Sequence, residues 1–208
     1  MQPSLFPQCE TIQLPTIDGQ PSGELHYYAG VFQPQAQRWL QQLLAEVEWQ
    51  QDNIRIAGKW IAVPRLQAWY GEFGHTYQYS GIKLVPEPWQ GSVAEIREQV
   101  ETLLQKNFNA VLVNLYRNGL DSVSWHADDE PELGERPVIA SLSLGATRRF
   151  SMKPKAAGKA KPIHLELAAG SLLVMGAGVQ EAWLHAVPKQ SEISGQRINL
   201  TFRSIALL

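Results

Sequence analysis

The second half of the chain constrains the fold most, because it consists of short β-prone runs separated by turn residues. Eight such runs lie at 109–116, 122–127, 137–144, 147–152, 162–167, 171–175, 183–187 and 196–204. Short strands in such number pack as facing sheets, so the pattern predicts a β-sandwich or jelly roll. Between the first two runs, Asn118-Gly119 predicts a two-residue hairpin, since both central positions of a type I′ turn need positive φ.

Two amphipathic helices precede these strands. The first opens at Pro34, and its apolar residues recur at three- and four-residue spacing: Ala36, Trp39, Leu40, Leu43, Leu44 and Val47. The second opens at Ser92, which matches Glu95 in a capping-box pattern, and it ends near Lys106. Each helix has one apolar face that a sheet can cover. We therefore expect an α+β, mainly β chain with both helices packed on one sheet.

Composition favours one domain, because 208 residues that are 44% hydrophobic supply a single substantial core. Residues 1–30 are polar, proline-dotted and without period, which predicts an extended N-terminal arm ahead of a domain over 31–208. No signal pattern follows Met1 and no apolar run approaches the roughly 20 residues that cross a bilayer, so we expect a cytoplasmic protein without membrane contact. The sequence carries no signal for an oligomer, and we expect a monomer. Cys9 is the only cysteine, which excludes an intramolecular disulfide and a cysteine-based metal site.

One constellation has the chemistry of a metal site. His126 and Asp128 lie two positions apart in a β-prone run, so both side chains point to the same face. His185 lies 59 positions after His126 (185 − 126), in another such run. Two imidazoles and one carboxylate on one face of an ion leave positions open for a chelating cosubstrate and O₂, as in non-haem Fe(II) oxygenases. Zinc fits the same residues, and a lone His-x-Asp is also common in surface pairs.

A polar face on the last predicted strand adds to this constellation. Polar residues alternate there and so share one side of the strand: Arg197, Asn199, Thr201 and Arg203. Arginines on an inward face need anionic partners, and a dicarboxylate supplies two. Asn114 and Tyr116 place an amide and a phenol together on the first strand. The alternative is that this polar face is turned to solvent and the apolar residues between pack in the core.

In their order and spacing these residues resemble the AlkB family of Fe(II)- and 2-oxoglutarate-dependent dioxygenases, most closely its duplex-repair branch. The motifs that carry the resemblance are Asn114-x-Tyr116, His126-Ala-Asp128-Asp129-Glu130, His185 and Arg197-x-Asn199-Leu-Thr201-x-Arg203. Upstream, two stretches look like the family's nucleotide-recognition lid: Gly58-Lys59-Trp60 to Val63-Pro64-Arg65, and Tyr70-Gly71 to Tyr77-Gln78-Tyr79-Ser80-Gly81.

The resemblance implies a double-stranded β-helix (jelly roll) core over residues 109–205 and a lid over residues 50–90. It implies Fe(II) on His126, Asp128 and His185, with 2-oxoglutarate and O₂ as cosubstrates. The implied reaction decarboxylates 2-oxoglutarate to succinate and hydroxylates an alkyl carbon on a damaged base. The resulting hemiaminal releases formaldehyde and restores the base.

The resemblance also assigns the binding residues. Arg197 and Tyr116 would bind the distal carboxylate of 2-oxoglutarate, and Arg203 and Asn114 its chelating end. Two neighbours would support that pocket by hydrogen bonding, namely Asn199 and Thr201. The implied substrates are 1-methyladenine and 3-methylcytosine in DNA, and secondarily in RNA, flipped out of the stack. The residues implied to contact the base or the lid are Arg65, Tyr77, Tyr79, Asp129 and Glu130, with Tyr79 stacking on the base.

Any positive charge that binds nucleic-acid phosphates has to come from a local patch, because the net charge of the chain is −2. Six cations without an intervening acid lie in one stretch: Arg148, Arg149, Lys153, Lys155, Lys159 and Lys161. This run suits phosphate contact, and its alternative is a solvated loop. Ala57 stands where the duplex-repair relatives have an aromatic finger residue, so the choice between single and double strands stays open.

Three other interpretations stay open. The same oxygenase chemistry fits a protein side chain or small molecule as substrate. A non-catalytic jelly-roll binding module would retain the pocket without turnover. A zinc hydrolase would work without O₂. Iron-dependent decarboxylation of 2-oxoglutarate separates the oxygenases from the other two.

Overall fold

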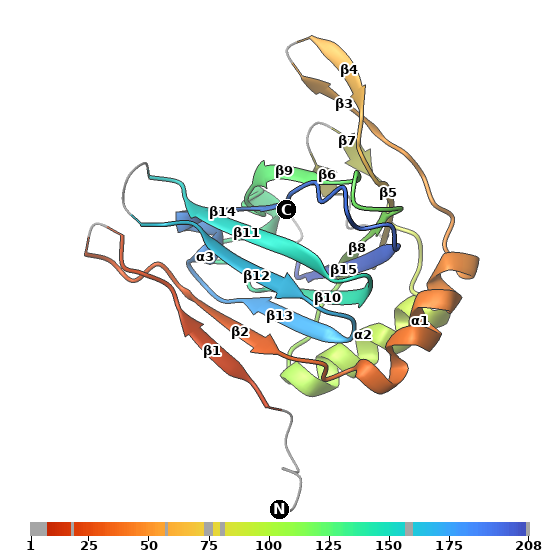
Figure 1. The fold of residues 1–208 in the computed structure, drawn as a ribbon, viewed down its shortest axis with the longest axis horizontal. Coiled ribbons are helices and arrows are strands. Elements are labelled where there is room, and N and C mark those ends of the chain that lie inside the picture. The colour runs from red at the N-terminus through yellow and green to blue at the C-terminus, as the bar shows by residue number, and fades with distance from the viewer. Residues whose placement is uncertain are drawn as a thin grey trace, which may run out of the picture.

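The computed structural model describes residues 8–17, 19–56, 58–72, 77–79, 82–156 and 160–206. Two antiparallel sheets face each other, and two helices cover the outside of the larger sheet (Figure 1). The larger sheet has the order β1-β2-β13-β10-β15-β8-β5. Its strands are β1 (Glu10–Gln13), β2 (Glu24–Tyr28), β5 (Leu66–Gly71), β8 (Ala110–Tyr116), β10 (Ile139–Gly145), β13 (Ser171–Met175) and β15 (Arg197–Arg203).

The smaller sheet has the order β12-β11-β14-β9. Its strands are β9 (Val123–His126), β11 (Arg148–Pro154), β12 (Ile163–Leu167) and β14 (Trp183–Val187). All eight strands expected after residue 109 are present, and they divide equally between the two sheets. The predicted jelly roll is therefore confirmed.

The helices are α1 (Gln33–Glu46), α2 (Gly91–Leu104) and the short α3 (Val179–Ala182), with a 3-10 turn at Pro131–Leu133. Side chains of β15 alternate between the two faces of the larger sheet, so one face packs against the helices and the other faces the smaller sheet. Ile198, Leu200 and Phe202 are fully buried against α1 and α2, so the two helices cover one sheet as expected. The intervening polar residues therefore face the space between the sheets. None of the helices in the described ranges has the length and apolar content that a membrane span needs.

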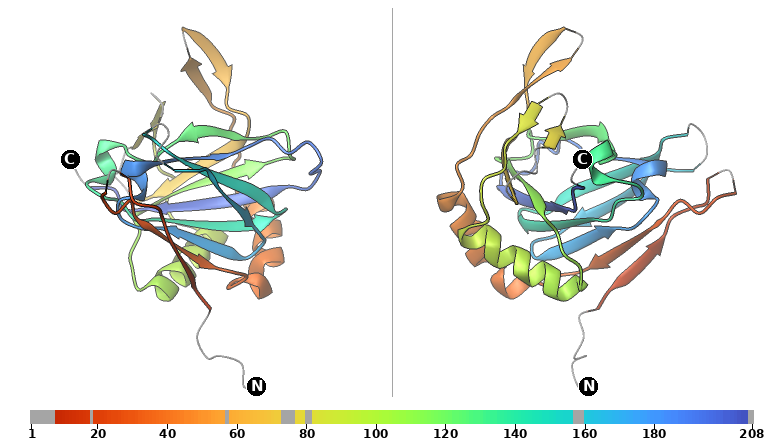
Figure 2. Two further views of the ribbon diagram at one scale, coloured as in Figure 1. Left: turned by 60° about the vertical axis from the view of Figure 1, so that its left-hand side comes forward. Right: turned by 180° about the vertical axis from the view of Figure 1, so that it is seen from behind.

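Two hairpins lie beyond the sheets. β3 (Asn53–Ile56) pairs with β4 (Lys59–Ala62), and this hairpin projects from the body of the molecule in every view (Figures 1 and 2). β6 (Tyr77–Tyr79) pairs with β7 (Ile82–Leu84). Both hairpins fall in the region expected to form a lid. Ala57, the residue at the expected finger position, lies outside the described residues.

The N-terminal arm and the Asn118-Gly119 hairpin differ from expectation. β1 and β2 extend the larger sheet, because β2 pairs along β13 and buries Leu25 completely. β8 and β9 belong to different sheets, so Asn118-Gly119 does not join a hairpin. A Cβ atom on Gly119 would lie 1.7 Å from the backbone oxygen of Gln190. This glycine is needed for a close backbone approach, not for a positive φ.

The predicted capping box is also wrong. The Ser92 hydroxyl caps nothing, and the Ser92 N–H instead donates to the Glu46 carboxylate of α1 over 2.9 Å. Glu95 accepts hydrogen bonds from Arg38 at 2.9 Å and from the Trp39 indole at 3.1 Å. The two carboxylates therefore join the helices to each other, a tertiary use that local spacing does not reveal.

Candidate metal centre and cosubstrate cavity

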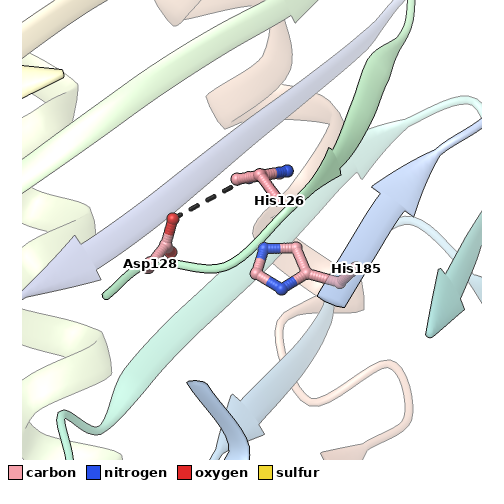
Figure 3. Close-up of side chains that lie close together, drawn as sticks. All are labelled: His126, Asp128 and His185. Carbon is pink, nitrogen blue, oxygen red and sulfur yellow. Dashed lines mark ion pairs between the residues drawn. The ribbon is translucent and has the colours of Figure 1, made fainter. Parts of the chain in front are cut away.

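The smaller sheet brings the two predicted histidines together. His126 ends β9 and pairs in register with His185 of β14, and Asp128 follows two residues later. The ligand atoms of the three residues all lie within 4.8 Å of one another. His126 Nε2 is 3.8 Å from Asp128 Oδ1 (Figure 3). The predicted proximity of His126 and Asp128 is therefore present, although Asp128 lies beyond the end of β9, and the sheet supplies His185.

Hydrogen bonds orient each member of this triad. His126 Nδ1 donates to the backbone carbonyl of Ser124 at 2.8 Å, which leaves Nε2 for a ligand. Asp128 Oδ2 accepts from Arg203 at 3.0 Å, and the Asp128 N–H donates to the Gln180 side chain at 2.9 Å.

Two polar atoms of the triad are left for an ion. In the described part of the chain, Asp128 Oδ1 and His185 Nδ1 are buried without a hydrogen-bond partner. Buried polar atoms without partners are costly. A carboxylate oxygen and imidazole nitrogens are ligands that Fe(II) takes, so the residues fit a metal ion.

The protonation states suit metal binding. Burial raises the pKa of Asp128, but the guanidinium of Arg203 and the two imidazoles outweigh burial and hold this pKa at about 2. Burial, followed by the charge of His126, lowers the pKa of His185 to about 3, and burial also lowers the pKa of His126. Near neutral pH the carboxylate is ionised and both imidazoles are neutral, which are the forms that coordinate a metal.

A cavity between the sheets continues from the triad along β8 and β15. Its polar lining includes all six residues expected to bind the cosubstrate: Asn114, Tyr116, Arg197, Asn199, Thr201 and Arg203. The polar face of β15 is therefore turned inward. The solvent-facing alternative is wrong for these residues, since each is more than nine-tenths buried.

Arg197 is the residue of this cavity that most clearly needs a ligand. It is 1% exposed, and its Nη2 donates to the Ser143 hydroxyl at 2.9 Å. Nε and Nη1 have no hydrogen-bond partner among the described residues. The Tyr116 ring centre lies 5.1 Å from the guanidinium carbon. A buried cation with two unused donors is suited to bind a carboxylate.

The remaining lining residues bond to one another. Arg65 is buried and its Nε donates to Asn114 at 2.6 Å. Asn199 donates to the Ser141 hydroxyl at 2.8 Å, and the Thr201 hydroxyl donates to Asn199 at 3.0 Å. Arg65 thus lies in the wall of the cavity beside His126, while its expected contact with a base stays a prediction.

The other expected substrate residues are only partly described. Tyr77 and Tyr79 lie in β6, and their side chains fall outside the described structure. Asp129 pairs with Lys155 over 2.6 Å at the surface next to the metal loop. Glu130 is half-buried and precedes the 3-10 turn.

The basic run does not form one continuous surface. Arg148 is 1% exposed, and its guanidinium donates to the backbone carbonyls of Asn118, Asp121 and Pro188, so its expected phosphate contact is wrong. Arg149 pairs with Glu166 over 3.0 Å. Lys159 lies outside the described residues.

Sequence reasoning missed two parts of the site. Ser141 and Ser143 face the cavity from β10, and their alternation with apolar neighbours in that strand is a signal that could have found them. Gln180 has no such signal. It lies next to Glu181 in a four-residue helix, and only the fold places it against Asp128.

Known proteins resemble this chain over most of its length. The model of the 2OG-Fe(II) oxygenase superfamily matches residues 24–203. Mouse (Mus musculus) DNA oxidative demethylase ALKBH2 is 40% identical over 159 residues, which are 74% of this chain and 66% of the relative. Human (Homo sapiens) alpha-ketoglutarate-dependent dioxygenase alkB homolog 3 is 40% identical over 187 residues, 86% of this chain and 65% of the relative. The chain thus spans slightly less than two thirds of the length of these relatives.

A solved structure agrees with the fold. "The structure of OsALKBH1" superposes with a TM-score of 0.56 at 18% identity, covering 86% of this chain and 97% of that one. At this identity the likeness concerns the fold alone.

Proposed function

Because the chain belongs to the AlkB family within the 2OG-Fe(II) oxygenase superfamily, we propose that it oxidatively demethylates N-alkylated nucleic-acid bases. Its substrates in this proposal are 1-methyladenine and 3-methylcytosine, chiefly in DNA and secondarily in RNA. The observation that carries the proposal is that one cavity contains both the His126-Asp128-His185 triad and the Arg197 guanidinium, whose Nε and Nη1 have no hydrogen-bond partner among the described residues.

In the proposed enzyme His126, Asp128 and His185 hold Fe(II). Together with 2-oxoglutarate and O₂, the bound metal supplies the oxidant that hydroxylates the alkyl carbon. The Arg203 guanidinium pairs with Asp128 Oδ2 at 3.0 Å, which fixes the direction of the carboxylate. Gln180 accepts the Asp128 N–H and so holds the backbone of the same residue.

The polar lining of the cavity would bind 2-oxoglutarate at both ends. Arg197 takes the distal carboxylate with the Tyr116 phenol, since both residues line the cavity and Nε and Nη1 of Arg197 have no partner among the described residues. Arg203 and Asn114, near the triad, take the end that chelates the metal. Asn199 and Thr201 hold that wall in place through Ser141.

The base would approach the triad from the side of the lid. We assign its contacts to Arg65 in the cavity wall, to Tyr77 and Tyr79 of β6, and to the loop residues Asp129 and Glu130. Tyr79 is the proposed stacking partner. A hydroxymethyl group on a ring nitrogen is a hemiaminal, so it breaks down to formaldehyde and the normal base without strand cleavage.

The metal triad and the cosubstrate cavity are complete within one chain, and we propose that the protein acts as a monomer. We also propose a cytoplasmic location, where a lone cysteine and a ferrous centre suit reducing conditions.

Incubation under air of anaerobically purified, iron-loaded protein with 2-oxoglutarate and an oligonucleotide carrying 1-methyladenine tests the function. We expect succinate and formaldehyde in equal amounts and recovery of adenine. Asp128→Ala, which removes one ligand, is the matched inactive variant. Succinate without base repair would leave an oxygenase with another substrate, and no succinate at all would refute the oxygenase.

A further inference from the structure

The strand that carries His126 also carries an exposed tryptophan. Trp125 directly precedes His126 on β9, so alternation turns its side chain away from the metal cavity. It is 41% exposed, one of few large apolar side chains with that exposure in the described chain. β9 is an edge strand of the smaller sheet. The indole therefore lies at the rim of the sheet, one residue from the proposed site of oxidation.

A lysine without a carboxylate partner lies over this indole. Lys153 Nζ is 4.6 Å from the Trp125 ring centre. Met152 pairs with His185 across the sheet and so faces the space between the sheets. Lys153 is the next residue of β11, so its side chain points to the outer face of the smaller sheet, as that of Trp125 does. Within the described residues Lys153 makes no ion pair, whereas its neighbours in the basic run do: Arg149 with Glu166 and Lys155 with Asp129.

We propose that Trp125 and Lys153 form a contact platform for an unpaired nucleic-acid strand that flanks the base held in the site. The inference rests on the proposed function and names the form of its substrate. The indole stacks on a neighbouring base and the ammonium contacts the adjoining phosphate. An aromatic face combined with a positive charge is how proteins bind single strands without reading sequence.

The charges and the fold favour this partner. With a net charge of −2 the chain has no overall attraction for phosphates, so a local cation near the site carries more of the binding. A base inside a duplex has no free face for an indole, which makes an unpaired strand the fitting occupant. The β3–β4 hairpin projects from the same end of the molecule as β9 (Figures 1 and 2), and it carries Trp60, a second exposed aromatic side chain, at 70% exposure.

The test compares oligonucleotides of two lengths with one central 1-methyladenine, a trimer and an undecamer, by fluorescence anisotropy. The wild-type protein should bind the undecamer more tightly. In Trp125→Ala the undecamer should lose about 5- to 100-fold in affinity and the trimer little, because one stacking contact is lost. Trp125→Phe should retain most of the gain. Lys153→Gln should lower the slope of log Kd against log salt by about 0.7 for a single strand.

Leu120→Ala is the matched control, because Leu120 is 57% exposed and lies before the start of β9, away from His126. Thermal unfolding of each variant checks the fold. Equal undecamer affinity in Trp125→Ala and wild type would overturn the platform, as would an equal loss for the trimer. Tighter binding to a fully paired duplex than to the single strand would also overturn it. A wild-type protein that turns over 2-oxoglutarate but binds neither oligonucleotide would instead refute the proposed substrate, and a protein partner would then be sought for this surface.

Discussion

Gln180→Leu tests how the fold holds the metal carboxylate. Gln180 is fully buried, its Oε1 accepts the Asp128 N–H at 2.9 Å, and its Nε2 donates to the Met175 sulfur at 3.3 Å. It lies in α3, which leads directly into the strand of His185. One side chain therefore connects the loop of one ligand to the element that carries another.

The size of the effect follows from the group left behind. Leucine fills a similar volume but accepts no hydrogen bond, so the Asp128 N–H stays buried without a partner. Such a group costs about 1–3 kcal/mol, and the loop can recover part of this only by moving toward water. That movement shifts the carboxylate away from the two imidazoles. Losses of about 10- to 100-fold in metal affinity are typical when a residue that supports a ligand is changed. We expect a loss in that range for Fe(II).

Anaerobic titration with Fe(II), together with thermal unfolding of the metal-free protein, measures both consequences. Met175→Leu is the control, because it removes only the sulfur contact and keeps the acceptor for Asp128. It should change stability by less than about 1.5 kcal/mol and leave the Fe(II) affinity unchanged. A Gln180→Leu variant that is less stable but whose Fe(II) Kd rises by less than about tenfold, the smallest loss expected, would contradict this role of Gln180.

Three further predictions concern the cavity, a turn and the helix pair. Arg197→Met should raise the KM for 2-oxoglutarate at least about tenfold while leaving the metal-free protein as stable or more so, because it removes a buried cation whose Nε and Nη1 have no partner among the described residues. Steady-state kinetics and thermal melts check it, and an unchanged KM would contradict it. Gly119→Ala should destabilise the fold by about 3 kcal/mol or more, since the new Cβ would meet the Gln190 oxygen at 1.7 Å; denaturant unfolding measures it. The hydrogen bond from Arg38 lowers the pKa of Glu95, and burial only partly opposes it. A carboxylate whose pKa is lower in the folded than in the unfolded protein stabilises the fold at pH values above its unfolded pKa. Wild type should therefore be more stable than Glu95→Gln at pH 7, by at most about 1 kcal/mol because both side chains of the pair are exposed. This difference in stability should vanish as the pH falls below 4.5. An advantage that grows in acid would contradict this.

Among the sequence patterns, the alternation of side chains along strands predicted most about the site. It placed the four polar residues of β15 on one face, because the period of a strand is two whatever its surroundings. His126 and Asp128 also lie together as predicted, although β9 ends at His126 and Asp128 is in the loop that follows. Which face points inward is decided by the second sheet and the helices. The apolar residues of β15 could have packed against either, and only the packing of α1 and α2 sends the arginines into the cavity.

The missed elements depend on contacts between distant segments. β2 is polar at its ends and short, yet it pairs because β13 would otherwise expose its edge. Asn118-Gly119 matches a hairpin turn locally, but the chain crosses between sheets there and uses the glycine against Gln190. Neither partner is visible within a local window of sequence.

The basic run shows how alternation could have been carried further. Arg148 has the same parity as Phe150 and Met152, which are buried between the sheets, so the period of two already assigns Arg148 to the inside. Arg149 and Lys153 have the opposite parity and lie on the outer side. Of these two, Arg149 is neutralised by Glu166, while Lys153 faces the Trp125 indole. Fewer cations of the basic run are therefore available to a nucleic-acid strand next to the metal site than the sequence suggests. One of them, Lys153, lies over an aromatic ring.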